Sequence, residues 1–146
     1  MFLDTAIIVK LLVTEADSAF FQEALAGEPL SASELSLPET WSTLLAKERK
    51  GVISAKQRSA AWRVLQERVE SEEILLHPLN SAVLRRAHHV LERCHPAVSL
   101  RTLDAIHTAA CDLSQDFPLC TTDRRMRDAA EMLGIPVFPA AESATQ

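Results

Sequence analysis

The sequence predicts a three-layer α/β fold in which a central, mostly parallel sheet of about five strands is flanked by helices. Short apolar runs alternate along the chain with longer helical segments, and this alternation is typical of the class. The apolar runs lack the alternation of polar and apolar residues that a half-exposed strand requires, so helices are expected to cover both faces of the sheet. A length of 146 residues suits one domain with its own core.

The expected strands are short: residues 2–3, 30–32, 74–76, 119–120 and 136–138. The helices expected between them are residues 5–13, 16–26, 36–50, 54–71, 80–94, 102–115 and 124–133. We expect the domain to cover residues 1–139 and to be followed by a short tail, residues 140–146, that frays.

Capping residues support these boundaries. Each of the three glycines follows an expected helix, where a left-handed residue commonly ends it: Gly27, Gly51 and Gly134. Three polar residues stand where helix N-caps are wanted: Ser54, Asn80 and Thr102. Ser36 and Glu39 have the spacing of a capping box at the start of the third helix, with Pro38 inside its first turn.

Charge is distributed unevenly, although the net charge is only −5. Residues 1–46 have seven acids and one base, residues 47–68 have seven bases and two acids, and residues 69–146 have eleven acids and seven bases. The net acidity alone argues against a nucleic-acid partner. The basic middle segment is consistent either with a solvated helix face or with a positive rim that attracts a polyanion to an acidic site.

The chain has the composition of an ordinary globular protein of the cytoplasm. No apolar run approaches the roughly 20 residues that span a bilayer, so no membrane association is expected. The N-terminus lacks the basic region and cleavage pattern of a secretory signal. The three cysteines, odd in number and without C-x-x-C spacing, are expected to be buried, reduced thiols.

Four carboxylates occupy equivalent places in this scheme. Asp4 follows the first expected strand, Asp123 follows the fourth, and Glu39 and Asp104 lie in the first turns of helices. Loops after the carboxyl ends of parallel strands share one edge of a sheet, where ligands bind. We therefore expect the four side chains to meet at that edge.

Each acid alone has a simpler explanation. A carboxylate at a helix N-terminus caps amides and interacts with the helix dipole, which is worth roughly 0.5–2 kcal/mol. A capping box accounts for Glu39 and an N-cap for Asp123, whereas Asp4 and Asp104 lie hard against apolar residues. Together, however, the four charges would repel one another without a cation. A cluster of carboxylate oxygens selects Mg²⁺ or Mn²⁺ over zinc, and such ions support displacement at phosphorus.

Four segments resemble, in order, the motifs of PIN-domain nucleases, and in particular the VapC-type toxins of type II toxin–antitoxin systems. They are "MFLDTAIIVKLL", "LSASELSLPETWSTLLAKERKGVIS", "LRTLDAIHTAA" and "LCTTDRRMRDAAEMLGIPVF". Each motif alone is weak, but four in family order with compatible spacing are specific. The resemblance covers residues 2 to about 138 and implies a PIN-like sandwich, in agreement with the fold predicted above.

The resemblance also implies an activity. Asp4, Glu39, Asp104 and Asp123 would be the catalytic quartet, with Asp4, Asp104 and Asp123 as ligands of Mg²⁺ or Mn²⁺. Thr5 and Thr121 would be supporting hydroxyls that orient carboxylates or metal-bound waters. The implied protein is an endoribonuclease toxin that cleaves RNA by attack of metal-activated water at phosphorus, leaving a 5′-phosphate and a 3′-hydroxyl. Its implied partners are a small antitoxin, which blocks the site, and a second copy of the chain.

Several residues are less settled from the sequence. Arg49, Lys50 and Arg101 are candidates for RNA contacts, although Arg101 is equally well explained as a surface charge. His107 lies one turn after Asp104 and is within reach of it on the helix, but a histidine among apolar neighbours is more often a buried structural residue.

Three other functions remain open. An aspartyl-phosphate phosphatase would require D-x-D after the first strand, where this chain has Asp4-Thr5-Ala6. A receiver-like domain would require a second acidic pair and a lysine on the last strand, and neither is found. A non-catalytic RNA- or protein-binding module would keep the fold without turnover, which the intact quartet argues against.

Overall fold

The computed structural model describes residues 1–140, and these form an α/β domain around one parallel sheet. The strands are β1 (Phe2–Leu3), β2 (Leu30–Ser33), β3 (Ile74–His77), β4 (Leu119–Cys120) and β5 (Val137–Phe138). Their spatial order is β3-β2-β1-β4-β5, and every pair of neighbours is parallel. The expected sheet is confirmed. The expected fraying of the tail concerns residues 140–146, nearly all of which lie outside the described residues.

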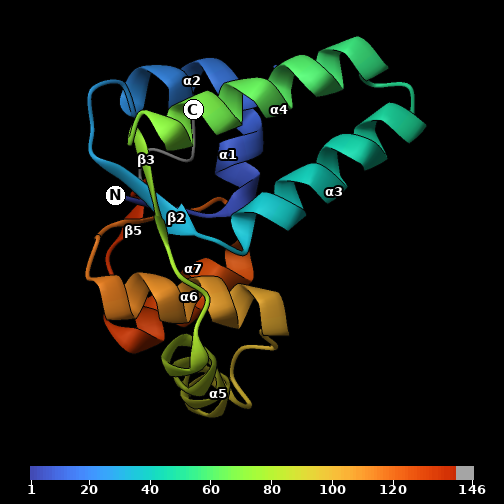
Figure 1. The fold of residues 1–146 in the computed structure, drawn as a ribbon. Coiled ribbons are helices and arrows are strands. Elements are labelled where there is room, and N and C mark those ends of the chain that lie inside the picture. The colour runs from blue at the N-terminus through green and yellow to red at the C-terminus, as the bar shows by residue number, and fades with distance from the viewer. Residues whose placement is uncertain (141–146) are drawn as a thin grey trace.

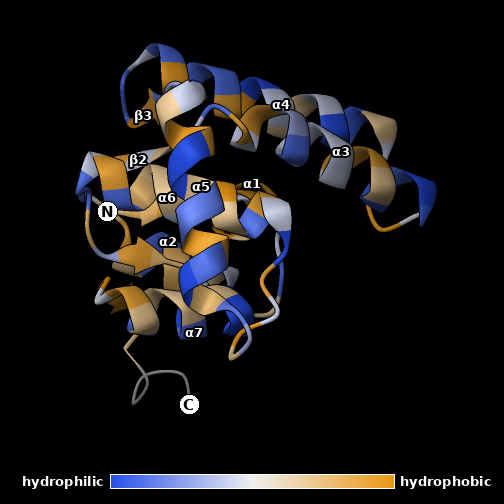
Figure 2. Ribbon diagram, turned by 90° about the horizontal axis from the view of Figure 1, so that it is seen from below, coloured by the Kyte–Doolittle hydropathy of each residue, from blue (hydrophilic) through white to orange (hydrophobic). Residues whose placement is uncertain are grey.

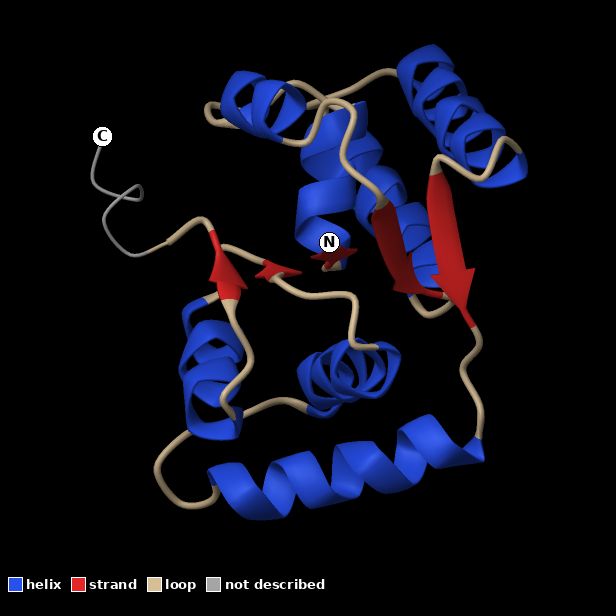
Figure 3. Cartoon of the chain, turned by 90° about the vertical axis from the view of Figure 1, so that its left-hand side faces the viewer, coloured by secondary structure: helices blue, strands red, loops and turns tan. Residues whose placement is uncertain are grey.

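Helices cover both faces of the sheet (Figure 1). They are α1 (Thr5–Leu12), α2 (Ser18–Ala24), α3 (Ser36–Arg49), α4 (Ala55–Glu70), α5 (Ser81–Cys94), α6 (Thr102–Ser114) and α7 (Arg124–Leu133). The first four lie on one side of the sheet, and α6 and α7 lie on the other. Figure 3 shows α5 outside α6, on the side of α6 away from the sheet.

Adjacent residues of the short strands point into different cores. Phe2 of β1 packs with Ala105, Leu119 and Met126 beneath the sheet, whereas Leu3 packs with the α1 and α2 side above it. Successive side chains of a strand point to opposite faces, so a strand covered on both sides needs apolar residues at every position. This accounts for the unbroken apolar runs in the sequence.

The helices α3 and α4 form a hairpin that extends beyond the sheet (Figures 1 and 2). Trp41 and Trp62 pack edge to face across it, with ring centroids 5.0 Å apart, and the Arg58 guanidinium lies 5.1 Å from the Trp41 ring. Arg49 and Lys50 are exposed at the far end of α3. The basic middle segment therefore belongs mostly to this projecting hairpin.

Most of the expected helix caps are confirmed. The Asn80 side chain accepts a hydrogen bond from the Val83 amide, and Ser54 forms a capping box with Gln57. Two predictions were wrong by one residue. Leu35 and Arg101, rather than Ser36 and Thr102, are the N-cap residues of α3 and α6, and neither side chain caps its helix.

The cysteines agree with expectation. Cys94, Cys111 and Cys120 are free and buried. Burial raises the pKa of the Cys111 and Cys120 thiols to about 12, so they remain protonated and unreactive near neutral pH. In residues 1–140 no helix combines the length and apolarity needed to cross a membrane.

The topology predicts where a ligand would bind. Strand order reverses at β1, with β2 and β3 on one side and β4 and β5 on the other. The crevice at the carboxyl ends of strands around such a reversal is the usual binding site of open parallel sheets. Asp4 directly follows β1, and Thr121 to Asp123 directly follow β4.

Candidate active site

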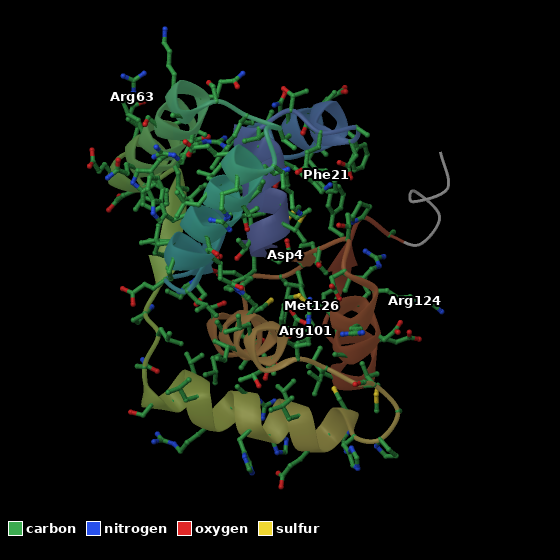
Figure 4. All side chains as sticks on the ribbon, turned by 90° about the vertical axis from the view of Figure 1, so that its right-hand side faces the viewer. Asp4, Phe21, Arg63, Arg101, Arg124 and Met126 are labelled. Carbon is green, nitrogen blue, oxygen red and sulfur yellow. The ribbon has the colours of Figure 1, made fainter. Side chains whose placement is uncertain are left out.

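The four predicted acids line one cavity at this edge of the sheet. Its volume is ≈ 490 Å³, and Asp4, Glu39, Asp104 and Asp123 are all part of its wall. The supporting residue Thr5 also lines it, whereas Thr121 lies fully buried behind Asp4. Figure 4 shows Asp4 at the level of the sheet, with Arg101 and Met126 beneath it. The convergence that the sequence predicts is present in the structure.

Asp4 is held from three directions. Its backbone N–H donates to the Cys120 carbonyl at 3.1 Å, which fixes it beside β4. Its Oδ1 accepts from the Ile7 amide at 2.9 Å as the N-cap of α1, and its Oδ2 accepts from the Thr121 hydroxyl. Only 3% of the residue is exposed. Burial raises the pKa of the Asp4 carboxyl above its ordinary value, although these hydrogen bonds act in the opposite direction.

Thr121 connects Asp4 to Asp123. The Asp123 amide donates to Thr121 Oγ1 at 3.0 Å, while the Thr121 hydroxyl donates to Asp4. Asp123 is the N-cap of α7, and its Oδ1 accepts from the Met126 amide at 3.0 Å. The N-cap explanation of Asp123 is therefore correct for one oxygen, and Oδ2 remains directed toward the cavity and Arg101.

Glu39 forms a polar cluster with Thr5 and His107. Its Oε1 accepts from the Thr5 hydroxyl at 2.9 Å and from His107 Nε2. Because a carboxylate can only accept, Nε2 carries the shared proton. Burial is the largest single influence and acts to raise the pKa of the Glu39 carboxyl, but the hydrogen bonds from His107 and Thr5 and the charges of His107 and Arg101 together outweigh it, and the pKa lies below its ordinary value. The expected capping box at Ser36 is wrong because Glu39 faces these partners instead.

His107 is a buried residue that also positions the Glu39 carboxylate. It is 3% exposed, in agreement with the expectation of a buried structural histidine. Its hydrogen-bond partner, however, is Glu39, 68 positions away in the sequence, and not the neighbouring Asp104. Its Nδ1 is buried without a partner among the described residues, so the ring is held through Nε2 alone.

Asp104 and Asp123 share one arginine. Arg101 Nε donates to Asp104 Oδ2 at 2.7 Å, and Arg101 Nη2 lies 3.4 Å from both Asp104 Oδ1 and Asp123 Oδ2. These two ion pairs raise the pKa of the Arg101 guanidinium, with Asp104 making the larger contribution. Arg101 is thus more than an isolated surface charge.

The other end of the cavity is lined by two lysines that the sequence did not single out as site residues. Lys10 Nζ lies 3.1 Å and Lys47 Nζ 2.8 Å from the two oxygens of Glu15, and Lys10 also pairs with Asp17 at 2.6 Å. Lys10 is the one base among residues 1–46, which is the signal that could have marked it. Each lysine charge is matched by a carboxylate.

The predicted RNA contacts lie in different places. Arg101 lines the cavity, but Arg49 and Lys50 do not. Ten residues of helix separate Glu39 from Arg49, a rise of about 15 Å. The structure therefore does not bring Arg49 and Lys50 together with the acids.

The donor set suits a hard divalent cation. Carboxylate oxygens are the ligands that Mg²⁺ and Mn²⁺ prefer, and Asp104 and Asp123 already face one common cation, the Arg101 guanidinium. Across the described range, residues 1–140, no three His, Cys, Asp or Glu side chains surround a point ready to hold a metal ion. Arg101, His107 and Thr121 instead engage the carboxylate oxygens.

A parallel sheet in the order β3-β2-β1-β4-β5, with four acids lining a cavity at the carboxyl edge, is the arrangement expected from the PIN-type sequence motifs. Comparison with known families agrees: the PIN domain family model matches residues 1–132. The chain therefore belongs to the PIN domain family.

A relative of known name indicates which members of the PIN domain family this chain resembles. The chain is 36% identical over 141 residues to Ribonuclease VapC46 of Mycobacterium tuberculosis (strain ATCC 25618 / H37Rv), and the match covers 94% of this chain and 95% of the relative. Together with the family match, this identity supports a nuclease of the VapC ribonuclease toxin group, as the sequence motifs predicted.

Solved structures confirm the fold. The Mycobacterium tuberculosis toxin VapC20, described as cleaving the sarcin–ricin loop, superimposes with a TM-score of 0.68 at 19% identity, covering 88% of this chain and 93% of that one. FitAcB from Neisseria gonorrhoeae superimposes with a TM-score of 0.65 at 18% identity, covering 94% and 95%. At such identities the likeness concerns the fold alone.

Proposed function

We propose that this protein is a metal-dependent endoribonuclease toxin. The observation that supports this most is the convergence of Asp4, Glu39, Asp104 and Asp123 on one cavity at the reversal point of the sheet. Four carboxylates in one cavity repel one another without cations, and the helix caps that Asp4 and Asp123 make do not account for the presence of Glu39 and Asp104 in the same cavity.

In this proposal Asp4, Asp104 and Asp123 hold Mg²⁺ or Mn²⁺. When bound, such a cation lowers the pKa of a coordinated water and neutralises charge that develops on a phosphate. Thr121 keeps Asp4 in place, since its hydroxyl donates to one carboxylate oxygen while the Ile7 amide donates to the other. Both carboxylate oxygens are therefore fixed before any ligand arrives.

Glu39 is the proposed acceptor of a proton from the attacking water. Thr5 and His107 both donate to Oε1, while Oε2 accepts no hydrogen bond from the described residues. The low pKa of Glu39 keeps its carboxylate ionised at neutral pH. The VapC motifs imply that attack of water at phosphorus breaks the bond to the 3′ oxygen, which takes up a proton from solvent, so that cleavage leaves a 5′-phosphate and a 3′-hydroxyl.

The proposed RNA contacts are Arg101 at the cavity and, more remotely, Arg49 and Lys50. Phosphate contacts of this kind add salt-dependent affinity without reading the base sequence. The hairpin that carries Arg49 and Lys50 projects to one side of the site (Figure 1), so an RNA longer than a few nucleotides is needed to reach both.

We also propose a small antitoxin partner that blocks the acidic cavity, a homodimer, and action in the cytoplasm. These proposals rest on the motifs of the VapC group and on the names of the relatives. The acidity of the cavity suits an inhibitor that inserts a basic side chain. Sequencing the flanking genome for a short reading frame, and co-expressing any such frame with this chain before light scattering of the product, tests the partner and the dimer together.

The activity is tested by incubating the purified full chain with cellular RNA and Mg²⁺ or Mn²⁺, and then mapping the product ends. The proposal predicts discrete cuts with 5′-phosphates, and relief of growth inhibition by Asp4→Asn. RNA binding without cleavage in either metal would favour the non-catalytic module. Trapping of an acyl phosphate on Asp4 would favour the phosphatase.

A further inference from the structure

We propose that Arg101 is an internal competitor of the metal: its guanidinium neutralises Asp104 and Asp123 in the metal-free protein, and a divalent cation must displace it to bind. This inference rests on the proposed function, because it assumes that these carboxylates hold the metal. It adds a regulatory role for a residue of this chain that the metal chemistry alone does not require.

The contacts of Arg101 involve the oxygens that a cation would need. Asp104 meets the guanidinium through both oxygens, at 2.7 Å and 3.4 Å. Asp123 has one oxygen engaged in capping the Met126 amide, and the other lies 3.4 Å from Arg101 Nη2. A cation that takes an oxygen from each acid therefore competes directly with the guanidinium.

The metal-free site needs a positive charge in this position. Asp104 and Asp123 come from the starts of α6 and α7, and their side chains are only 12% and 31% exposed. Two carboxylates that face the same guanidinium with limited solvent around them repel each other. A planar guanidinium can bridge two carboxylates with separate N–H groups, and Arg101 does so here.

Arg101 can also move away from Asp104 and Asp123. Its side chain is 63% exposed, and the hydrogen bonds of its guanidinium within residues 1–140 all go to these two acids. The guanidinium end of both ion pairs faces solvent, so Arg101 can exchange water for its carboxylate partners at modest cost. Arg127 of α7 offers a contrast, because its guanidinium donates to the backbone carbonyls of Thr121 and Pro139 and joins α7 to the chain on either side of it.

The consequence is a site that is held together without metal but binds metal less tightly than its acids alone would allow. Removing the guanidinium removes the competitor and should strengthen metal binding. A residue that merely supported the ligands would have the opposite effect, since its loss would disorder Asp104 and Asp123 and weaken binding. The sign of the change therefore distinguishes the two roles.

The test is calorimetric titration of the metal-free full chain with Mn²⁺. We expect Arg101→Gln to bind roughly threefold to fivefold more tightly than wild type, the upper part of the range for loss of a solvent-facing charge pair. Arg101→Lys keeps the charge without the planar fork and should fall between them. The matched control is Arg124→Gln, which removes the same charge beside Asp123 but makes no ion pair within the described residues; its affinity should stay within about twofold of wild type.

A second measurement does not depend on a variant. In wild type labelled with ¹⁵N, the Arg101 Nε–H resonance should shift during titration with Mg²⁺, with the same midpoint as the calorimetric curve. Unchanged or weaker Mn²⁺ binding by Arg101→Gln, or an Nε–H resonance that Mg²⁺ does not move, would overturn the inference and leave the proposed function standing. Absence of Mn²⁺ binding by wild type would overturn both.

Discussion

The hydroxyl of Thr121 donates a hydrogen bond to the buried carboxylate of Asp4, 117 positions away in the sequence. The same hydroxyl oxygen accepts from the Asp123 amide at 3.0 Å. One fully buried side chain thus joins the ends of β1 and β4 and fixes two of the four acids relative to each other. The precision of the candidate site depends on this small contact.

Replacing Thr121 with valine should therefore damage both stability and activity. Valine has a similar shape but leaves the Asp4 oxygen and the Asp123 amide without this partner. We expect a loss of roughly 2 kcal/mol in the free energy of unfolding and about a tenfold to hundredfold loss of RNA cleavage, as for other residues that orient metal ligands. Urea unfolding and a cleavage assay measure the two effects. Thr121→Ser keeps the hydroxyl and should recover most of the activity; equal losses in both variants would contradict this role.

The effect of His107 on the pKa of Glu39 should be measurable in the pH dependence of RNA cleavage. Its hydrogen bond lowers the pKa of Glu39, so His107→Ala should raise that pKa. If Glu39 is the proton acceptor, it must be ionised, and the acid limb of the kcat/KM profile then moves to higher pH. His107→Gln retains an N–H donor and should restore part of the wild-type profile. A uniform loss of activity at every pH would instead assign His107 a purely structural role.

Asp4→Asn should stabilise the metal-free protein while abolishing its activity. Burial raises the pKa of Asp4 above its ordinary value of 3.8, so the folded state binds the proton more tightly than the unfolded state. The contribution of Asp4 to stability is therefore present at low pH and is lost as the pH rises through the raised pKa. The asparagine carbonyl oxygen can accept from the Ile7 amide, and its NH2 group can donate to Thr121 Oγ1, so both contacts can be kept without the charge. We expect a gain of about 1 kcal/mol in unfolding free energy near neutral pH.

Denaturant unfolding in EDTA at several pH values checks this prediction. The other carboxylates are common to both proteins, so the difference between variant and wild type isolates Asp4. That difference should grow as the pH rises from 3.8. A constant difference, or a variant less stable than wild type at neutral pH, would show that the hydrogen bonds to ionised Asp4 already offset the cost of burying its charge.

The fold was largely predictable because its determinants are local or repetitive. The caps at Ser54 and Asn80 depend on residues three positions away, and the unbroken apolar strands reveal a sheet covered on both faces. The exception at Ser36 is instructive. Its spacing to Glu39 satisfies a local rule, but Thr5 and His107 offer Glu39 stronger partners from other elements.

The acids of the site were predictable from topology, but their partners were not. Parallel strands bring their carboxyl ends to one edge, so Asp4 and Asp123 had to approach each other. The pairing of His107 with Glu39, and of Arg101 with both Asp104 and Asp123, depends on how α3, α6 and α7 are oriented around that edge. Spacing along a single helix, which suggested His107 with Asp104, carries no information on that orientation.

The most direct test of the account compares the RNA cleavage rates of wild type, Asp104→Asn and Asp128→Asn in Mg²⁺. Asp128 is an exposed acid of α7 outside the cavity and serves as the matched control. We predict that EDTA stops wild-type cleavage and Mg²⁺ restores it, that Asp104→Asn loses at least about a hundredfold, and that Asp128→Asn cleaves as wild type does. Cleavage that persists in EDTA, or that survives in Asp104→Asn, would contradict the account.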